Sequence, residues 1–383
     1  MIDNLKSFLR VKKYRNLAVI ASFLFLMSIA LFYTVSNNEW RYKNPIAKVI
    51  SVNNSNGEIK EDLSGNSEQT IKQTIEAKIM NGKHKGQMVQ LENSTSFTGA
   101  YDINLSAGDE VFLKFEEDAD GKIINPEAKN LKRDTYLAYI VLIFSFLILV
   151  IGGIKGFRSL ISVIMNVVIF SFAIGIYLGG GYNIYVLFIM ASIVFVVVSI
   201  FLVCGVNKKS ISAILGTFAS TICTMTLLLI VLYITGGNGL HFENMEFNLG
   251  NYQEIFLVEI LIGTLGGIMD LAVSISSAIQ ELKEHNPDIS PTEMMRSGME
   301  IGKDTMGTMA NALLFAYISG SIPMIIMWMV NDISIGSIIS FYLSLEVIRA
   351  LVGSIGVVLS IPVTLVIATR VFHRKPKIEV IDL

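Results

Sequence analysis

Charged residues and cysteines are scarce in this sequence. Only 16% of the 383 residues are charged, whereas soluble domains average roughly 25%. The formal net charge is −2 and no basic stripe stands out, so we expect no nucleic-acid partner. The two cysteines, Cys204 and Cys223, both lie in apolar stretches. This placement indicates neither a disulfide framework nor a cysteine metal site.

Motifs that mark common enzymes are also absent. No G-x-x-x-x-G-K-[ST] loop occurs, which excludes phosphate binding of the P-loop kind. No G-x-S-x-G nucleophile context occurs either. We therefore expect no enzymatic activity, no cofactor and no metal, and any uphill work would draw on an ion gradient or a partner ATPase. The histidines are scattered and form no H-E-x-x-H pair; they are His84, His241, His285 and His373.

Long apolar runs dominate the sequence instead. Hydrophobic residues make up 52% of the chain and the mean hydropathy is +0.58, which is typical of an α-helical polytopic membrane protein surrounded by lipid. A transmembrane helix needs roughly 20 apolar residues. Eight spans are predicted on this basis, at residues 17–35, 136–154, 159–178, 183–204, 211–235, 253–279, 305–330 and 337–369.

The distribution of Lys and Arg predicts how these spans are oriented. Both residues cluster before the first span and after the second, fourth, sixth and eighth. The opposite short connections, at residues 179–182, 236–252 and 331–336, contain neither. By the positive-inside rule both termini, residues 1–16 and 371–383, are cytoplasmic. The first span is interpreted as an uncleaved signal anchor, because its apolar core is long and no A-x-A site follows.

A polar segment, residues 36–135, separates the first two spans. Alternating apolar and polar residues at 71–80, 86–93 and 109–118 predict half-buried strands joined by turns. Several short strands at this spacing indicate a small extracytoplasmic β-barrel, OB-like or SH3-like. Asn53–Ser67 ("NNSNGEIKEDLSGNS") is expected to be a loop. Stacking aromatics over a basic face are absent, which favours a structural or protein-contact role over oligomer binding.

The sixth span carries a carboxylate at its centre, in "GTLGGIMDLAVSISSAIQEL". At about 100° per residue, a stripe of small and polar side chains falls within about 40° of one line. Small residues allow close helix packing and hydroxyls bond across the gap, so we predict that the stripe, with its carboxylate, faces other helices. Its members are Gly263, Gly267, Asp270, Ser274, Ser277 and Glu281.

Two later spans carry polar groups as well. Asp304, Thr308 and Asn311 share one face near the cytoplasmic end of the seventh span. In the eighth span, Glu346 and Arg349 are spaced i, i+3 and can pair within their own helix. Embedded charges cost several kcal/mol unless they are paired or hydrated. One arginine cannot neutralise all of these acids, so a leftover acid takes up a proton or meets cations in a wet cavity.

The leftover acid predicts a transporter or permease for a small solute or ion. The alternative is a membrane-embedded receptor or scaffold, in which the β-domain binds a partner and the buried charges are structural. A third hypothesis is an intramembrane enzyme with Asp270 and Asp304 as paired carboxylates. The predicted pathway is lined by Asp270, Asp304, Asn311, Glu346 and Arg349, with Ser274, Ser277 and Thr308 as a supporting polar stripe.

The connection before the seventh span predicts a short amphipathic helix. Ser290 is a candidate N-cap, and Glu293 follows three residues later, as in a capping box. Such a helix would serve as a cytoplasmic gate or as a docking segment.

Three segments resemble hallmark sequences of the bacterial YibE/YibF family: "GGIMDLAVSISSAIQEL", "SGMEIGKDTMGTMANALLFAYISGSIP" and "GSIGVVLSIPVT". The resemblance covers roughly residues 136–370. It implies a seven-helix membrane domain in a multi-pass bacterial plasma-membrane protein, often partnered by a related protein, but no particular reaction; a homo-oligomer is the alternative partnership. Positions that match the family motif are Asp270, Ser274, Glu281, Gly302, Asp304, Gly307, Thr308, Asn311 and Tyr317.

Overall fold

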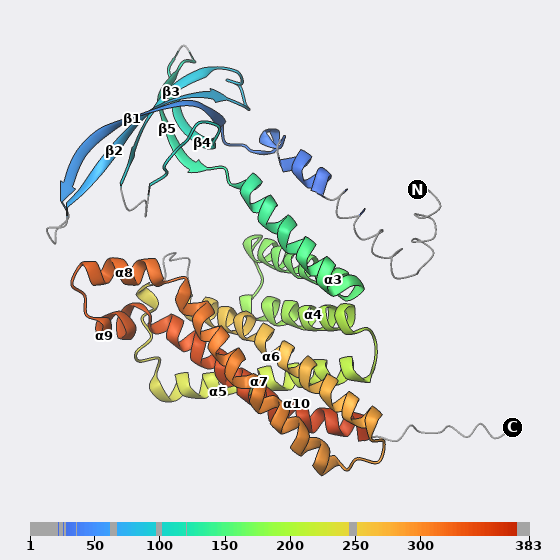
Figure 1. Cartoon of the computed structure of the whole chain (residues 1–383). Coiled ribbons are helices and arrows are strands. Elements are labelled where there is room, and N and C mark those ends of the chain that lie inside the picture. The colour runs from blue at the N-terminus through green and yellow to red at the C-terminus, as the bar shows by residue number, and fades with distance from the viewer. Residues whose placement is uncertain are drawn as a thin grey trace, which may run out of the picture. The chain divides into compact units, whose positions relative to one another are not determined.

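The chain divides into two compact units, Met1–Gly156 and Phe157–Leu383 (Figure 1). About half of the first predicted span, residues 17–35, is described, and these residues (22, 26 and 28–35) are helical. The C-terminal tail from residue 374 lies outside the described residues. The computed structural model describes residues 22, 26, 28–35, 37–61, 67–96, 102–119, 121–244 and 251–373.

The N-terminal unit contains a five-stranded antiparallel sheet with the order β3-β2-β1-β4-β5. Its two edge strands, β3 and β5, lie close to each other, and ten buried apolar residues form the core inside it. Closure of this sheet into an OB-like or SH3-like barrel stays a prediction. The strands are β1 (Ile46–Glu61), β2 (Ser67–Ile79), β3 (Met88–Thr95), β4 (Glu110–Glu117) and β5 (Ile123–Leu131), preceded by a 3-10 turn, η1 (Glu39–Arg41).

The strand predictions are confirmed for β2, β3 and β4. The loop prediction for Asn53–Ser67 is wrong over most of its length, because β1 continues to Glu61 and pairs Asn53 with Thr74. Most side chains of this outer part of β1 are exposed. A strand with water on both faces needs no apolar alternation, so its polar sequence carried no strand signal. Residues 62–66 lie outside the described part of the chain.

A polar cluster joins the sheet to the helix that follows it. Asp134, in the first turn of α3 (Asp134–Leu178), accepts hydrogen bonds at its Oδ2 from Tyr42 Oη (2.5 Å) and Asn38 Nδ2 (2.8 Å). The buried Lys132 ammonium lies 3.6 Å from the same oxygen and 2.6 Å from Glu110 Oε2. We call these five residues the Asp134 clamp. It fixes the sheet and the start of α3 as one structural piece.

The hydrogen bond to Asp134, together with burial, raises the pKa of Tyr42 from 10.0 to about 12. We expect Asp134→Asn to return this pKa towards 10.0, since the amide carries no charge to oppose the phenolate. Because the folded-state pKa is the higher one, the stabilisation is complete below pH 10.0 and is lost as pH rises through about 12. An ultraviolet difference titration against Tyr42→Phe measures both values. An ordinary pKa for Tyr42 in the parent protein would contradict the prediction.

Helix α3 contains a break between the two spans predicted within it. Gly153 has φ 54° and ψ −127°, a combination that L-residues rarely adopt and glycine tolerates. The predicted spans at 136–154 and 159–178 therefore correspond to the two halves of α3. The break lies three residues before the end of the N-terminal unit.

The C-terminal unit consists of the second half of α3 and the helices that follow. Side-chain oxygens cap several of them; Asn183 and Asn207, for example, accept backbone N–H groups at the starts of α4 and α5. Gly236, in the left-handed region, ends α5. The helices are α4 (Ile184–Cys204), α5 (Lys208–Thr235), η2 (Phe242–Asn244), α6 (Tyr252–His285), α7 (Pro291–Ser319), α8 (Ile322–Val330), α9 (Ile335–Ser337), the π-helical turn η3 (Ile338–Tyr342) and α10 (Ser344–His373).

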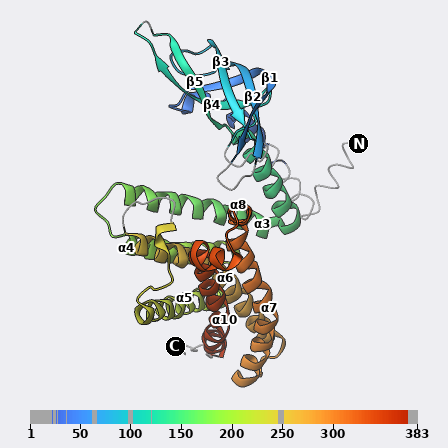
Figure 2. The ribbon, with the colours of Figure 1, turned by 90° about the vertical axis from the view of Figure 1, so that its left-hand side faces the viewer.

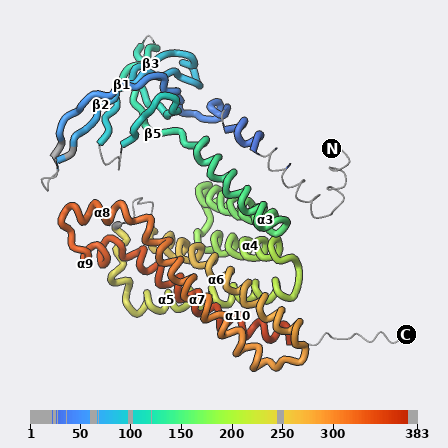
Figure 3. Tube along the Cα trace, viewed as in Figure 1, coloured from blue at the N-terminus to red at the C-terminus, as the bar shows by residue number. Residues whose placement is uncertain are grey.

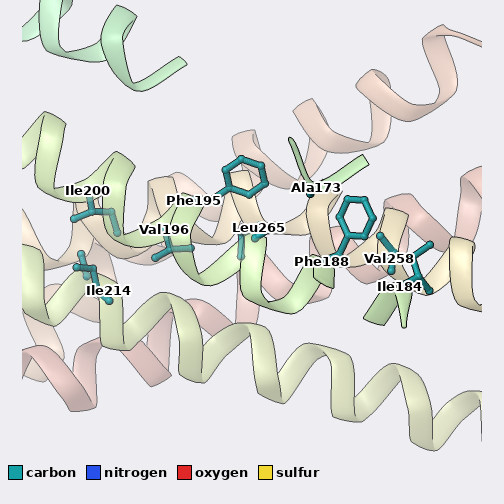
Figure 4. Packing of buried hydrophobic residues seen from close by; sticks show 11 residues of the cluster. Ala173, Ile184, Phe188, Phe195, Val196, Ile200, Ile214, Val258 and Leu265 are labelled. Carbon is teal, nitrogen blue, oxygen red and sulfur yellow. The ribbon is translucent and has the colours of Figure 1, made fainter. Parts of the chain in front are cut away.

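Helix α10 forms the centre of this unit. It packs against α5, α6 and α7, and Figure 2 shows it between α5 and α7. An apolar cluster joins α4 to α5 and α6, where Phe195 and Val196 of α4 lie near Leu265 of α6 and Phe188 lies near Val258 (Figure 4). The packed core therefore places α6, α7 and α10, which carry all of the predicted pathway residues, beside one another.

Five helices among the described residues are long and apolar enough to cross a membrane, or six if α7 and α8 count as one bent span. The predicted span count of eight stays a prediction. The span predicted at 305–330 is not one straight helix: α7 and α8 are bent by 54°, with Pro323 near the start of α8. Figure 3 shows the chain turning from α7 through α8 and α9 into α10.

The region before the seventh span also differs from expectation. The Ser290–Glu293 capping box is present, as predicted. The short separate helix is not, because α7 runs without a break from Pro291 to Ser319. Gly298 and Gly302 lie in this stretch, but both are buried inside the helix against Leu365 and Ile361 of α10, so neither ends it.

Candidate functional site

A charged cluster lies between α6 and α10. Arg349 of α10 forms an ion pair with Glu346 one turn earlier, as the i, i+3 spacing predicted, and its second terminal nitrogen lies 2.5 Å from Glu259 Oε2 of α6. The guanidinium also lies over the Phe256 ring, 5.5 Å from its centroid. The Arg349 side chain is only 14% exposed. One cation thus holds two helices together through two carboxylates.

Glu259 is the residue that sequence reasoning missed. It lies within the predicted sixth span, so its charge alone marked it as an embedded group in need of a partner. With both acids ionised the cluster carries a net charge of −1. The Nε of Arg349 is buried without a hydrogen-bond partner among the described residues. The cluster is therefore an incompletely neutralised group, and its Glu259 side chain is 41% exposed.

Asp270 lies away from this cluster. It follows Glu259 by eleven residues on α6, which is about 16 Å along the helix axis. Within the described part of the chain its carboxylate makes neither a hydrogen bond nor an ion pair, and the residue is exposed. The Ser274 and Ser277 hydroxyls donate to backbone oxygens of their own helix, at Asp270 and Val273. They support the helix rather than the carboxylate.

Only part of the predicted stripe on α6 packs against other helices. Gly263 packs under the Tyr317 hydroxyl of α7, and Gly267 lies against Leu313 of α7 and Val357 of α10. Asp270, further along the same line, is exposed, and so is Ser274. The expectation that the whole stripe faces other helices is therefore wrong for its charged half. The reason is that α7 packs far more extensively along α10 than along α6.

The predicted polar residues of α7 lie on another surface. Asp304, Thr308 and Asn311 are all exposed, whereas Gly302 is buried against Ile361 of α10. Asn311 follows Gly302 by nine residues, which is about 180° around the helix. The structure thus brings Glu346 and Arg349 together with Glu259, but no hydrogen bond or ion pair of the described residues links this cluster to Asp270, Asp304 or Asn311.

Buried hydroxyls line the contact between α5 and α10. Thr364 of α10 lies over Gly216 of α5, and Thr224 of α5 lies beside Gly356 of α10. Four hydroxyls in this region are buried without a hydrogen-bond partner in the described residues: those of Ser220, Thr221, Thr364 and Thr369. Sequence reasoning missed them because single hydroxyls in an apolar run carry little signal. The i, i+3, i+4 and i+7 spacing of Thr217, Ser220, Thr221 and Thr224 would have indicated one polar face.

Glycines set the distance between α7 and α10. A Cβ added at Gly302 would lie 2.5 Å from Ile361 Cγ2, so we expect Gly302→Ala to lower the free energy of unfolding by about 1–3 kcal/mol through overpacking. Gly266→Ala on α6 is the matched control, since nothing lies within 4 Å of its added Cβ. Thermal unfolding of the purified protein in detergent measures both. Equal melting temperatures for the two variants would contradict the packing described.

Two family models match the chain. The model described as YibE/F-like protein matches residues 140–374. The model described as YibE/F family N-terminal domain matches residues 40–129. No curated protein and no solved structure matches the chain.

Proposed function

The chain belongs to the YibE/F-like family, and from this membership and the placement of Asp270 we propose that it is a permease for a small solute or ion. The helices long enough to cross a membrane support this. So do the Lys and Arg clusters, which favour a plasma-membrane protein with both termini in the cytoplasm. Metabolic energy would come from an ion gradient or a partner, since the sequence has no P-loop.

The isolated carboxylate of Asp270 carries this proposal. It lies near the middle of α6 and has no partner of opposite charge among the described residues. A carboxylate at such a depth is costly when ionised in hydrocarbon, and it is commonly found where protons or ions pass. It can alternate between a protonated form and a cation-bound form. Asp270 is therefore the proposed cation- or proton-handling group.

The Arg349 cluster supplies a second charged position on the same helix. Glu259 and Glu346 share one guanidinium, which leaves a net charge of −1 when both are ionised. Because Glu259 and Asp270 both belong to α6, a cation that leaves one carboxylate can be attracted by the other along one helix. Asp304 and Asn311 are exposed on α7, with Asn311 opposite the side that packs on α10, and we leave both out of the proposed pathway.

The runner-up function is a receptor or scaffold, and one feature of the β-sheet domain favours it. A hollow of about 480 Å³ is lined by aromatic, amide and lysine side chains. Such a lining suits a small polar ligand with an anionic group. The residues around it are Tyr42, Asn44, Phe112, Leu113, Lys114, Lys129 and Asn130.

Reconstitution separates the two functions. The full-length protein in liposomes, with an imposed pH gradient or membrane potential, is expected to move protons, Na⁺ or K⁺ faster than empty liposomes do. Ion-sensitive dyes inside the vesicles report the flux. A flux that ignores both driving forces, or is equal to that of empty vesicles for all three ions and for organic solutes, would favour the receptor.

A further inference from the structure

One side of α7 is exposed along most of the helix. The opposite side is buried against α10. Successive members of the exposed side are three or four residues apart, so they form one continuous strip. Phe315, at its apolar end, is 69% exposed. We call this strip the α7 outer face; it consists of Glu300, Asp304, Thr308, Asn311 and Phe315.

Lipid is an unsuitable neighbour for this face. Thr308 and Asn311 lie within the apolar part of α7, and an amide exposed to hydrocarbon loses its hydrogen bonds to water without replacement. The Thr308 hydroxyl donates to Thr305 O at 2.9 Å, but the Asn311 amide has no hydrogen bond among the described residues. Gly307 is exposed beside them, and nothing lies within 4 Å of an added Cβ there. A second backbone could approach closely at this point.

We propose that the α7 outer face packs against the same face of a second copy of this chain, with the two α7 helices parallel. The two predicted spans of the N-terminal unit offer no complement, because residues 17–35 and 136–152 contain no charged, amide or histidine side chain. A second α7 does, since the Asn311 amide both donates and accepts hydrogen bonds and can pair with another Asn311. This interface does not depend on the proposed transport.

The cytoplasmic end of the face is charged in a self-complementary way. Glu300 and Asp304 lie on the face, and Arg296 and Lys303 both lie on one flank of it. None of the four forms an ion pair in the part of the chain that the structure describes. Two-fold symmetry keeps the two basic flanks apart and sets each within reach of the partner's carboxylates. The charge pattern thus favours a second copy over a partner of unrelated sequence.

Disulfide formation in native membranes tests the interface. The full-length chain with Cys204 and Cys223 replaced by alanine receives a single cysteine by Asn311→Cys. Oxidation is expected to convert most of it into a species of twice the monomer mass, which carries both tags when two differently tagged copies are co-expressed. The matched control is Ile222→Cys on α5, 66% exposed, which should stay monomeric. Thr308→Cys replaces Asn311→Cys if the latter fails to accumulate.

Three results would overturn the proposal: a monomeric cysteine variant on the face, equal dimer yields at Asn311 and Ile222, or a product that contains one tagged copy and another protein. A charge swap tests the parallel arrangement. Asp304→Lys in the Asn311→Cys background should lower the dimer yield at least threefold, and adding Lys303→Asp should restore it. A double variant that accumulates in the membrane but stays monomeric would rule out parallel helices.

Discussion

Replacing Arg349 with alanine is expected to lower the free energy of unfolding by up to about 3–5 kcal/mol, the cost of unpairing a fully buried charge, because it leaves two partly buried carboxylates without their cation. Glu259 and Glu346 would face each other with no guanidinium between them, and the stacking on Phe256 would be lost too. The loss should appear as a large drop in melting temperature of the detergent-purified protein. Arg370→Ala is the control, since this exposed arginine at the end of α10 should matter by less than about 0.5 kcal/mol.

Rescue separates lost pairing from lost packing. Adding Glu346→Gln to Arg349→Ala should recover part of the stability, and adding Glu259→Gln as well should recover more, because each change removes one uncompensated charge. Arg349→Met, which keeps much of the apolar stem, should behave like Arg349→Ala if charge dominates. If the combined variants are destabilised by the sum of the single-variant effects, and stability does not recover, the three residues do not interact.

Asp270→Asn is expected to abolish flux while the protein still folds and inserts. The amide has nearly the shape of the carboxylate and can still form hydrogen bonds, but it neither ionises nor carries charge. No partner among the described residues depends on the Asp270 side chain, so stability should change by less than about 0.5 kcal/mol. Asp270→Glu should retain part of the flux. Vesicle flux at matched protein content measures these effects.

Ser274→Ala, one turn further along α6, serves as the control for Asp270. Its hydroxyl bonds only to the backbone oxygen of Asp270, so normal flux is expected. A fully active Asp270→Asn variant would contradict the proposed transport mechanism and would favour a purely structural role for the carboxylate. Loss of flux in Ser274→Ala as well would point to general disturbance of α6 rather than to chemistry at Asp270.

Local patterns predicted much of the fold. Alternation predicted β2, β3 and β4, and the Ser290–Glu293 spacing predicted the cap of α7. Hydropathy could not predict the bend between α7 and α8, because an average over a sequence window contains no information about the direction of the helix axis. It also could not place β1, whose outer half is polar on both faces and depends on pairing with β2.

The candidate site was predictable only where it is local. The Glu346–Arg349 pair lies within one helix, and its spacing alone indicates the contact. Glu259 joins that pair from another helix, ninety residues earlier, and the sequence does not say which face of α6 meets α10. For the same reason the sequence could not separate Asp270 from Asp304. Their separation depends on which helix α7 packs against most extensively, and that helix is α10.

The Asp134 clamp determines which fragment boundaries are suitable for producing the β-sheet domain by itself. A fragment cut to its strands would start at Ile46 and stop at Leu131. It would discard Asn38 and Tyr42 at one end and Lys132 with Asp134 at the other, leaving Glu110 without its cation. Boundaries that keep residues 37–136 retain every member of the clamp and add only the first three residues of α3, Asp134 to Tyr136.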